Sequence, residues 1–350
     1  MTGNSQPRIL VIGAGSMGII TGYHLTLAKA DVTFLVRPHR AQDLNRPQIL
    51  YCYEDNQLKE YSGYKYITDP SEIKTAGAPG YDFIVIALDG ASLKSETGVA
   101  LVKAMGEAAR KTKTKVILGS VFFNLRPWFL DVSGLAGDQV TNGHLDIHAY
   151  PPSRLTLPSE NQEVIAKADF AYTDKLGHGF TVDDSAPAVA AAFAELYGAS
   201  GVSGCIVASA AASAVAINAL FPVFAACELL GWPKLRDVGC GANAGLWTQL
   251  VVPAVREIQG LGVHGEAGRK AAEGKGLVAE LGAWEQHMLP LDLQAFNRFH
   301  HGDKLRAQGR EHLRACLEEG RGEGKEMRAL EGLLGRLGEG EGEGGSYFPG

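Results

Sequence analysis

The chain has 350 residues, a net charge of −6 and an isoelectric point near 5.9. This length favours two domains, and an acidic balance without a basic patch among aromatic residues argues against a nucleic-acid partner. The five cysteines are far apart and form no CxxC pair, and the first residues of the chain are polar. We therefore expect structural thiols in a reducing compartment, and a cytoplasmic protein without a secretion signal.

A strand, a glycine-rich turn and a helix are predicted at the start of the chain. The strand is RILVI at residues 8–12, and GAGSMG follows it at residues 13–18. In a dinucleotide-binding turn the first glycine permits the bend, the second lets the backbone approach the pyrophosphate, and the third lets the helix pack closely on its strand. The predicted cofactor contacts in this turn are Gly13, Ala14, Gly15, Ser16, Met17 and Gly18. A glycine turn that arose by chance is the alternative.

Arginines follow the second predicted strand, residues 32–36. Arg37 stands where a NAD-preferring fold carries an acid for the ribose 2′-hydroxyl, Arg40 comes soon after it, and no acid occurs before Asp43. Guanidinium groups bind phosphate well, so this pattern predicts NADP as the cofactor. Two solvated charges at the end of a strand are the alternative interpretation.

The alternation of strands and helices then continues and predicts a doubly wound parallel sheet. Residues 81–88 and 115–118 read as buried strands, and residues 92–110 between them read as an amphipathic helix. Ligands of such sheets bind at the carboxyl ends of the strands. The residues expected to border the cofactor there are Leu88, Asp89 and Ser120.

A change in composition near Pro187 divides the chain into three predicted parts, and the fold class is α/β. Residues 1–186 form a Rossmann-type, parallel-sheet, NADP-binding domain, and residues 187–337 form an all-α domain for substrate binding and dimerisation. Residues 338–350, rich in glycine and glutamate, form a mobile tail. One long helix is expected over residues 292–317 of the helical domain.

The segment from Leu196 to Cys227 contains no charged residue, which is long enough for a membrane span. It is, however, rich in alanine, serine and glycine, it contains Pro222, and no lysine or arginine flanks it closely. We therefore expect a helix buried within the helical domain and no membrane partner.

These features together resemble the ketopantoate reductase family over roughly residues 8–337, and the phrase FNRFHHGDK at residues 296–304 resembles a divergent form of the C-terminal domain of that family. The resemblance implies a two-domain enzyme in which NADPH and a 2-oxo acid, a small-molecule substrate, meet in the cleft between the domains. It also implies a homodimer through the helical domain.

The resemblance carries over to the cofactor residues, because Gly13, Gly15 and Gly18 match the glycine motif and Arg37 matches the phosphate-binding arginine. It does not carry over to the chemical residues. Typical members have a lysine where Asp89 stands and an asparagine near the position of Ser120. If residues 218–220 (NAL) correspond to the Asn-Pro-Leu of the family, the catalytic lysine and asparagine positions are Ala210 and Ala214. The chain thus resembles a divergent member of the family that lacks the usual catalytic Lys and Asn.

Reduction of a ketone needs a proton donor, which alanine cannot supply. The candidate donors are Ser209, Ser213 and Asn218 on the first long helix, and His300, His301 and Lys304 on a later one. The alternatives are that the serines bond back to their own helix and that the later residues form an exposed basic face.

Two other types of site are weighed and set aside. On a strand, His144, Asp146 and His148 would share one face as a metal set, but an ordinary edge strand explains the same pattern, and no metal is expected. The chain contains no GxSxG motif of a serine hydrolase.

The sequence therefore predicts an NADPH-dependent reductase of a carbonyl or imine other than ketopantoate. One alternative is a non-redox isomerase or cyclase of the same fold, in which His300 or Lys304 polarises the substrate. A second alternative is an NADP-binding sensor without catalysis, which the missing lysine and asparagine favour.

Overall fold

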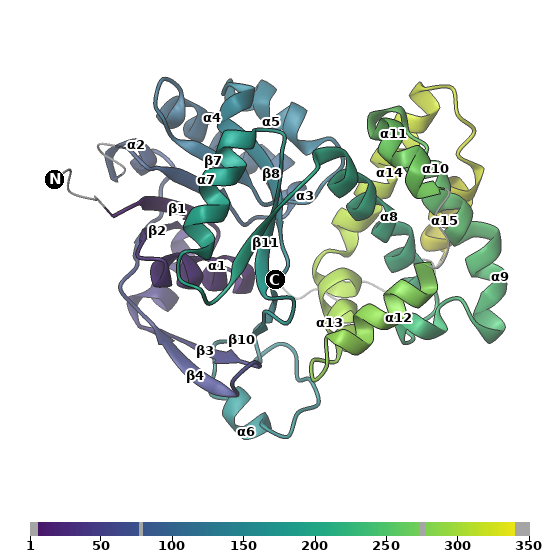
Figure 1. The fold of residues 1–350 in the computed structure, drawn as a ribbon, viewed down its shortest axis with the longest axis horizontal. Coiled ribbons are helices and arrows are strands. Elements are labelled where there is room, and N and C mark those ends of the chain that lie inside the picture. Colours follow the sequence, from purple (N-terminus) through teal and green to yellow (C-terminus); the bar gives the residue numbers. More distant parts are fainter. Residues whose placement is uncertain (1–5, 77–79, 273–276, 340–350) are drawn as a thin grey trace. The chain divides into compact units, whose positions relative to one another are not determined.

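The computed structural model describes residues 6–76, 80–272 and 277–339. Two compact units make up the chain, Met1–Ala210 and Ala211–Gly350 (Figure 1). The first is an α/β unit with a largely parallel sheet, and the second is helical. The predicted fold class, a Rossmann-type domain followed by an all-α domain, is confirmed.

An eight-stranded sheet forms the centre of the first unit, in the order β12-β11-β8-β7-β6-β1-β2-β5. Its strands are β1 (Arg8–Ile12), β2 (Asp31–Leu35), β5 (Lys65–Ile67), β6 (Phe83–Ile86), β7 (Lys115–Leu118), β8 (Val140–Leu145), β11 (His178–Asp183) and β12 (Gly204–Ala208). The chain passes from β1 outward through β2 to β5 and then returns to place β6 on the other side of β1. This reversal of direction leaves a crevice at the carboxyl ends of β1 and β6, where such sheets bind ligands.

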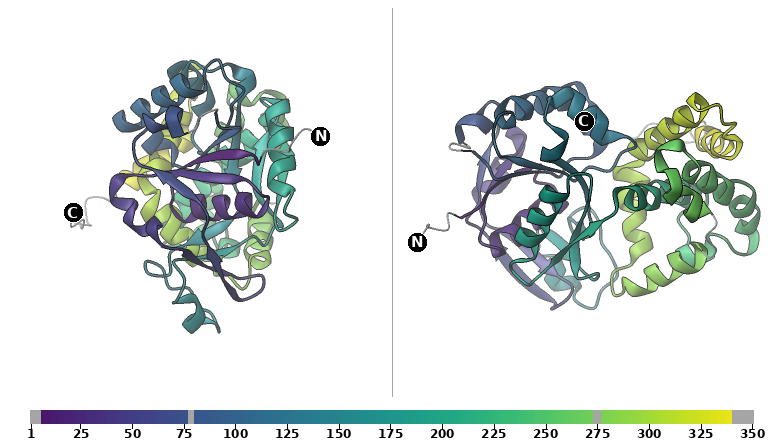
Figure 2. Two further views of the ribbon diagram at one scale, coloured as in Figure 1. Left: turned by 90° about the vertical axis from the view of Figure 1, so that its left-hand side faces the viewer. Right: turned by 45° about the horizontal axis from the view of Figure 1, so that its top comes forward.

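Alternate residues of the central strands are buried on opposite faces of the sheet. Ile9 and Val11 pack into one hydrophobic cluster, whereas Leu10 and Ile12 pack into another. Helices cover both faces (Figures 1 and 2), which explains why these strands read as continuous apolar runs. The helices are α1 (Ser16–Leu27) and α7 (Pro187–Gly198) on one face, and α2 (Glu72–Ala76), α3 (Gly90–Lys94), α4 (Glu96–Ala109) and α5 (Leu125–Ser133) on the other.

A second, four-stranded sheet belongs to the same unit and has the order β4-β3-β10-β9. Its strands are β3 (Gln48–Cys52), β4 (Gln57–Tyr61), β9 (His148–Tyr150) and β10 (Phe170–Thr173), and the short helix α6 (Gln162–Ile165) precedes β10. Its buried tyrosine hydroxyl groups have partners: Tyr150 contacts Tyr53, just after β3, at 2.6 Å, and Tyr51 donates to Asn56 at 2.7 Å. The sheet packs against α1.

The helix expected over residues 92–110 is divided in the structure. Ser95 has an extended backbone and its side chain accepts a hydrogen bond from the amide of Gly98, so it caps a new helix, α4. The preceding helix α3 is capped in the same way by Asp89. Short polar side chains at these two positions therefore set the helix boundaries.

The boundary between the compact units lies later than the predicted one. Pro187 does begin a helix, but Val189, Phe193 and Tyr197 of that helix are buried against the sheet. Within the region expected to be all-helical, the strand β12 pairs in parallel with β11. The change in composition thus marks the start of a helix, and the division into compact units falls after Ala210.

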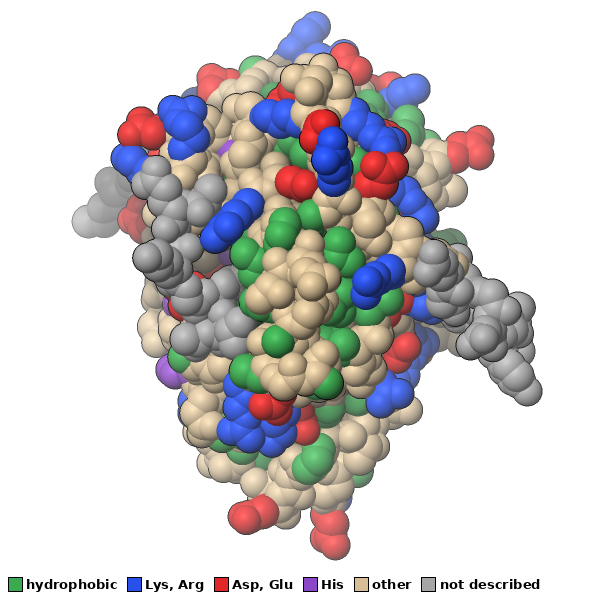
Figure 3. Space-filling view, turned by 90° about the vertical axis from the view of Figure 1, so that its right-hand side faces the viewer, with side chains coloured by type: hydrophobic (Ala, Val, Ile, Leu, Met, Phe, Trp, Pro, Cys, Tyr) green, Lys and Arg blue, Asp and Glu red, His purple; other side chains and the backbone are tan. Residues whose placement is uncertain are grey.

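The second unit consists of helices with short connections. They are α8 (Ala210–Leu229), α9 (Ala244–Leu246), α10 (Val252–Gln259), α11 (Gly265–Ala272), α12 (Leu277–His287), α13 (Leu293–Asn297), α14 (Arg306–Gly322) and α15 (Arg328–Glu339). The predicted long helix is α13 and α14 joined by a π-helical segment, Arg298–Lys304. On the face in Figure 3, hydrophobic side chains gather in the middle with Lys and Arg around them. Residues 340–350 of the predicted tail lie outside the described residues.

Helix α8 is, among the described residues, the one helix that is long and apolar enough to cross a membrane. Half of its most apolar window is buried within the structure, and Val215, Ala219 and Ala226 are among its buried residues. A core helix passes the same test of length and composition, as the sequence analysis expects for this segment.

A polar group of the first unit is buried without a partner. Both carboxylate oxygens of Asp174, which follows β10, are inaccessible and have no hydrogen-bond partner among the described residues. Burial raises the pKa of Asp174 to about 6, and the nearby negative charge of Glu54 adds to this effect. Since the charged form is disfavoured only in the folded state, Asp174 costs no stability well below the ordinary pKa of 3.8, costs more as the pH rises from there to 6, and costs a constant amount above it.

We predict that Asp174→Asn stabilises the protein at pH 8 by about 1 to 2 kcal/mol, allowing for solvent screening, and changes it little at pH 4. Urea unfolding at several pH values measures the difference from the wild type. The exposed Asp138→Asn variant is the matched control and should show no pH-dependent difference. A uniform effect of Asp174→Asn at all pH values would contradict the prediction.

Candidate functional site

The glycine turn after β1 joins strand and helix with very little space. Gly13 has φ of 98°, a conformation that favours glycine, and its amide donates to the carbonyl of Leu35 at 3.0 Å. A Cβ atom on Gly18 would lie 2.0 Å from the carbonyl oxygen of Gly13. Helix α1 can therefore lie against this turn only because residue 18 has no side chain.

Gly15 differs from Gly13 and Gly18, because a Cβ atom on Gly15 would meet nothing within 4 Å. Gly15 is the N-cap of α1, its backbone is extended, and no side chain caps the helix or brings an acid into its first turn. The amide groups and the positive end of the helix dipole are thus available to an anion. Residues 13–18 could hold the pyrophosphate of a dinucleotide in this open space.

The loop after β6 contacts the glycine turn directly. A Cβ atom on Gly13 would lie 2.9 Å from the side chain of Leu88, so Leu88 borders the turn, and its contact with a cofactor stays a prediction. Asp89 instead uses its carboxylate on its own helix, where it accepts from the amide and hydroxyl of Ser92 at 2.7 and 2.6 Å. The Ser120 hydroxyl donates to the carbonyl of Leu88 at 2.6 Å. Both polar side chains brace the loops of the crevice, and their contact with a cofactor stays a prediction.

The two arginines after β2 have different surroundings. Arg37 is exposed, and its extended backbone caps a short 3-10 helix. Arg40 donates to the carbonyl of Ala14 at 3.4 Å and forms an ion pair with Asp43 at 2.5 Å. Arg40 therefore ties this loop to the glycine turn, while Arg37 lies beyond the carboxyl end of the strand next to β1.

In the helical unit, Asn218 lies buried on α8. Its amide nitrogen is 2.9 Å from Nε2 of His264, whose Nδ1 is 2.8 Å from the carbonyl oxygen of Ile258. With Nδ1 donating to the carbonyl, Nε2 accepts from Asn218. Burial lowers the pKa of His264, which keeps its ring neutral in this arrangement. Asn218 thus has a structural partner, and its predicted role as a proton donor stays a prediction.

The other predicted catalytic residues lie in the π-helical segment and on α8. His301 stacks on Phe224 with the ring centres 3.8 Å apart, and His300 stacks on Phe296 at 5.4 Å. Lys304 is exposed, and Ser213 is half-buried in the first turns of α8. The structure therefore places His301 against α8.

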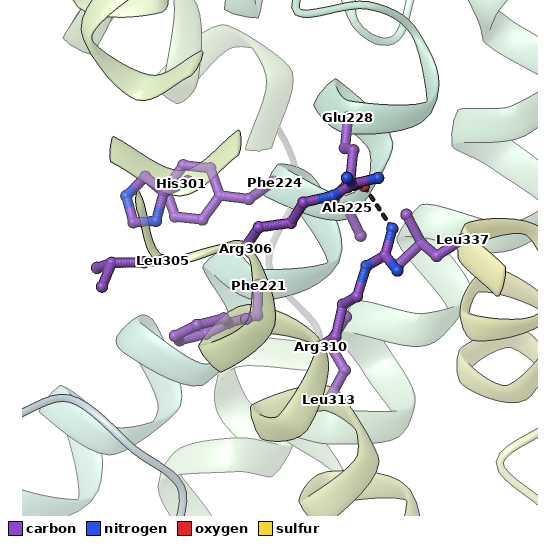
Figure 4. A pocket seen from close by; sticks show the side chains of 11 residues that line it. Phe221, Phe224, Ala225, Glu228, His301, Leu305, Arg306, Arg310, Leu313 and Leu337 are labelled. Atoms are coloured by element: carbon purple, nitrogen blue, oxygen red, sulfur yellow. Dashed lines mark hydrogen bonds and ion pairs between the residues drawn. The ribbon is translucent and has the colours of Figure 1, made fainter. Parts of the chain in front are cut away.

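His301 also lines a small pocket of the helical unit, which we call the helical pocket (Figure 4). It is lined by Phe221, Phe224, Ala225, Glu228, His301, Leu305, Arg306, Gly309, Arg310, Leu313 and Leu337. One oxygen of Glu228 accepts from Arg306 at 2.6 Å and from Arg310 at 2.7 Å. Glu228, Arg306 and Arg310 are not among the predicted site residues. The sequence shows the i, i+4 spacing of the two arginines, but their carboxylate partner is far away in the chain.

The metal-binding set considered in the sequence, His144, Asp146 and His148, does not form on one strand. β8 ends at Leu145, and His148 begins β9 of the other sheet, so the three residues do not share one strand. His144 lies 3.2 Å from Asp146, whose other oxygen accepts from the Thr181 hydroxyl at 2.7 Å. Within residues 6–76, 80–272 and 277–339 no three His, Cys, Asp or Glu side chains are grouped to hold a metal ion.

Comparisons with known proteins agree with this geometry. Residues 9–97 match the model of the family described as ketopantoate reductase PanE/ApbA. A search of curated proteins found no match.

Solved structures share the fold over nearly the whole chain. The 2-dehydropantoate 2-reductase from Methylococcus capsulatus has a TM-score of 0.61 and 16% identity, over 97% of this chain and 98% of that one. The 2-dehydropantoate 2-reductase from Geobacter metallireducens GS-15 has a TM-score of 0.57 and 16% identity, over 95% of this chain and 99% of that one. D-mandelate dehydrogenase in complex with NADH has a TM-score of 0.65 and 13% identity, over 96% of this chain and 99% of that one. The predicted resemblance to the ketopantoate reductase family is thus confirmed, in sequence for residues 9–97 and in fold for the chain.

We predict that Gly15→Val abolishes nucleotide binding and leaves the protein folded, since its side chain would enter only the space that the pyrophosphate needs. Thermal unfolding with and without NADP measures both effects. A variant that keeps the ligand-induced shift of the wild type would place the nucleotide elsewhere.

Substitution of Gly18 in the same turn should instead destabilise the folded protein. Gly18→Ala should lower the free energy of unfolding by about 1 to 3 kcal/mol, because its Cβ collides with the backbone of the turn. If Gly18→Ala were as stable as the wild type, the close packing of α1 on β1 would not depend on this glycine.

Proposed function

We propose that the protein is an NADPH-dependent reductase that acts on a carbonyl or imine of a substrate other than ketopantoate. The observation that carries the proposal is the glycine turn, which leaves open space at Gly15 against an uncapped helix N-terminus. The turn lies at the reversal point of the sheet, where doubly wound folds bind dinucleotides. The matched family and the structural neighbours, which are oxidoreductases by name, support a nicotinamide cofactor.

The preference for NADPH over NADH rests mainly on Arg37. Arg40 already has two partners, Asp43 and the carbonyl of Ala14. Arg37 is exposed after β2, and its guanidinium group can form charge-assisted bonds with a 2′-phosphate that NADH lacks. The absence of an acid at this position also removes the partner that a 2′-hydroxyl would use.

Bound NADPH supplies the hydride, and the chain must supply a proton to the reduced atom. If Asn218 corresponds to the Asn of the family's Asn-Pro-Leu, Ala210 and Ala214 at the start of α8 stand where typical members carry their catalytic lysine and asparagine. We propose His301 as the donor, because stacking on Phe224 fixes its ring plane and leaves its nitrogens at the ring edge. Its replacement by Ala should remove turnover of the true substrate without weakening NADPH binding.

We predict that the wild type binds NADPH more tightly than NADH and that Arg37→Asp reverses this preference by about 1 to 3 kcal/mol. Calorimetric titration with both nucleotides measures it. The matched control is Lys113→Asp, an exposed charge before the amino end of β7, which should change neither affinity. Equal affinities of the wild type for NADPH and NADH would contradict the proposed NADP specificity.

A further prediction concerns the substrate. The purified protein should reduce ketopantoate only at a trace rate, since loss of general acid catalysis lowers turnover by about a hundred- to ten-thousand-fold. The fall in NADPH absorbance at 340 nm measures turnover. Rapid turnover of ketopantoate would show that Ala210 and Ala214 are not the positions of the family's catalytic residues. No oxidation of NADPH with any carbonyl or imine would instead favour a nucleotide sensor.

A further inference from the structure

We propose that two copies of the protein associate through the strand β12 and so join their eight-stranded sheets. β12 is the last strand of that sheet and pairs in parallel with β11 on one side. Within residues 6–76, 80–272 and 277–339, no strand pairs with its other side. The proposal goes beyond the reductase function, because it assigns a surface of the first unit and the partner that covers it.

The free side of β12 presents unused backbone groups. The amide of Gly204 and the carbonyl of Ala208 are both bonded to the backbone on the β11 side, each at 3.0 Å. Peptide groups of successive residues in an extended strand point in alternate directions within the sheet. The N–H and C=O groups of Cys205 and Val207 therefore point to the free side, as a row of donors and acceptors with which a further strand can pair.

The side chains of this edge are apolar and exposed. Ile206 and Val207 are 43% and 46% exposed, and they lie on opposite faces of the sheet because neighbouring residues of a strand alternate. The described part of the chain exposes six large hydrophobic side chains, and Ile206, Val207 and the preceding Val202 are three of them. Exposed apolar side chains thus concentrate at the one strand edge, which is typical of an interaction surface.

The other sheet edges carry a protection that β12 lacks. β5 has three residues, and its Lys65 forms an ion pair with Asp31 at 2.8 Å. β4 carries Lys59 and Glu60, and β9 has three residues, two of them buried. Short length and charge keep strand edges from pairing with other chains. β12 has five residues without charge or proline, so among the described strands its edge is the one left open to a partner.

The pattern of this edge fits a second copy of itself. Because β12 has no charge, two copies meet without repulsion. An antiparallel arrangement with the twofold axis at Ile206 places Cys205 opposite the partner's Val207. These are the residues whose peptide groups point outward, so each such pair exchanges both of its N–H···O=C bonds. Ile206 then lies opposite the partner's Ile206 at a position without hydrogen bonds, where opposing side chains are closest.

Association of the full chain in solution tests the proposal. Analytical ultracentrifugation should show an equilibrium between monomer and dimer over about a hundred-fold range of concentration. Ile206→Lys brings two like charges together at the axis, and it should give monomer at every concentration with an unchanged melting temperature. Val263→Lys is the matched control, because Val263 is 50% exposed and lies in the second unit, and it should dimerise as the wild type does.

A cysteine cross-link tests the register of the two strands. In a Cys240→Ser background, which removes an exposed native thiol, Ile206→Cys should form an intermolecular disulfide with oxidised glutathione. The Cα atoms of such a pair without hydrogen bonds are about 4.5 Å apart, within the range that a disulfide spans. Val202→Cys is the control, since Val202 is more exposed, at 57%, but lies outside the pairing, and it should not cross-link.

Three results would overturn the proposal. They are a wild type that is monomeric at every concentration, a dimer that persists in Ile206→Lys, and equal cross-linking of Ile206→Cys and Val202→Cys. The second of these would place the contact on another surface, such as the helical unit.

Discussion

The contact between Gly18 and the carbonyl oxygen of Gly13 is the constraint on which the first unit depends. Any Cβ atom at residue 18 would come within 2.0 Å of that oxygen. Without it, α1 lies directly on the end of β1, and its first amide groups point into the open space at Gly15. The strand order reverses at β1, so that β6 lies beside β1 and the loop with Leu88 after β6 lies beside the glycine turn. A binding crevice follows from backbone packing, before any polar side chain is considered.

Many polar side chains near the two sites have structural partners. Asp89 caps α3, Ser120 holds the Leu88 carbonyl, and Asn218 bonds the neutral His264. A buried polar group without such a partner is costly, as the raised pKa of Asp174 illustrates. The groups that remain available to ligands are therefore few, and among them Arg37 carries the proposed cofactor preference.

Local patterns predicted those parts of the structure whose partners are close in sequence. The strands at residues 8–12 and 115–118 have the predicted bounds. The compact units divide after Ala210 rather than near Pro187, because β12 pairs with β11. The sequence did not predict this pairing, since an uncharged run of small residues reads equally well as a buried helix. The helical pocket could not be predicted, since Glu228 and Arg306 meet only through the packing of α8 on α14. Long-range pairing of this kind leaves no local periodicity to detect.

The π-helical segment Arg298–Lys304 has a consequence for everything that follows it. A π turn contains more residues than an α turn, and each additional residue rotates the rest of a helix by about 100° around its axis. The segment therefore sets the phase of α14, and with it the direction in which Arg306, Gly309 and Arg310 face. The widened turn thus acts as an angular offset between α13 and α14.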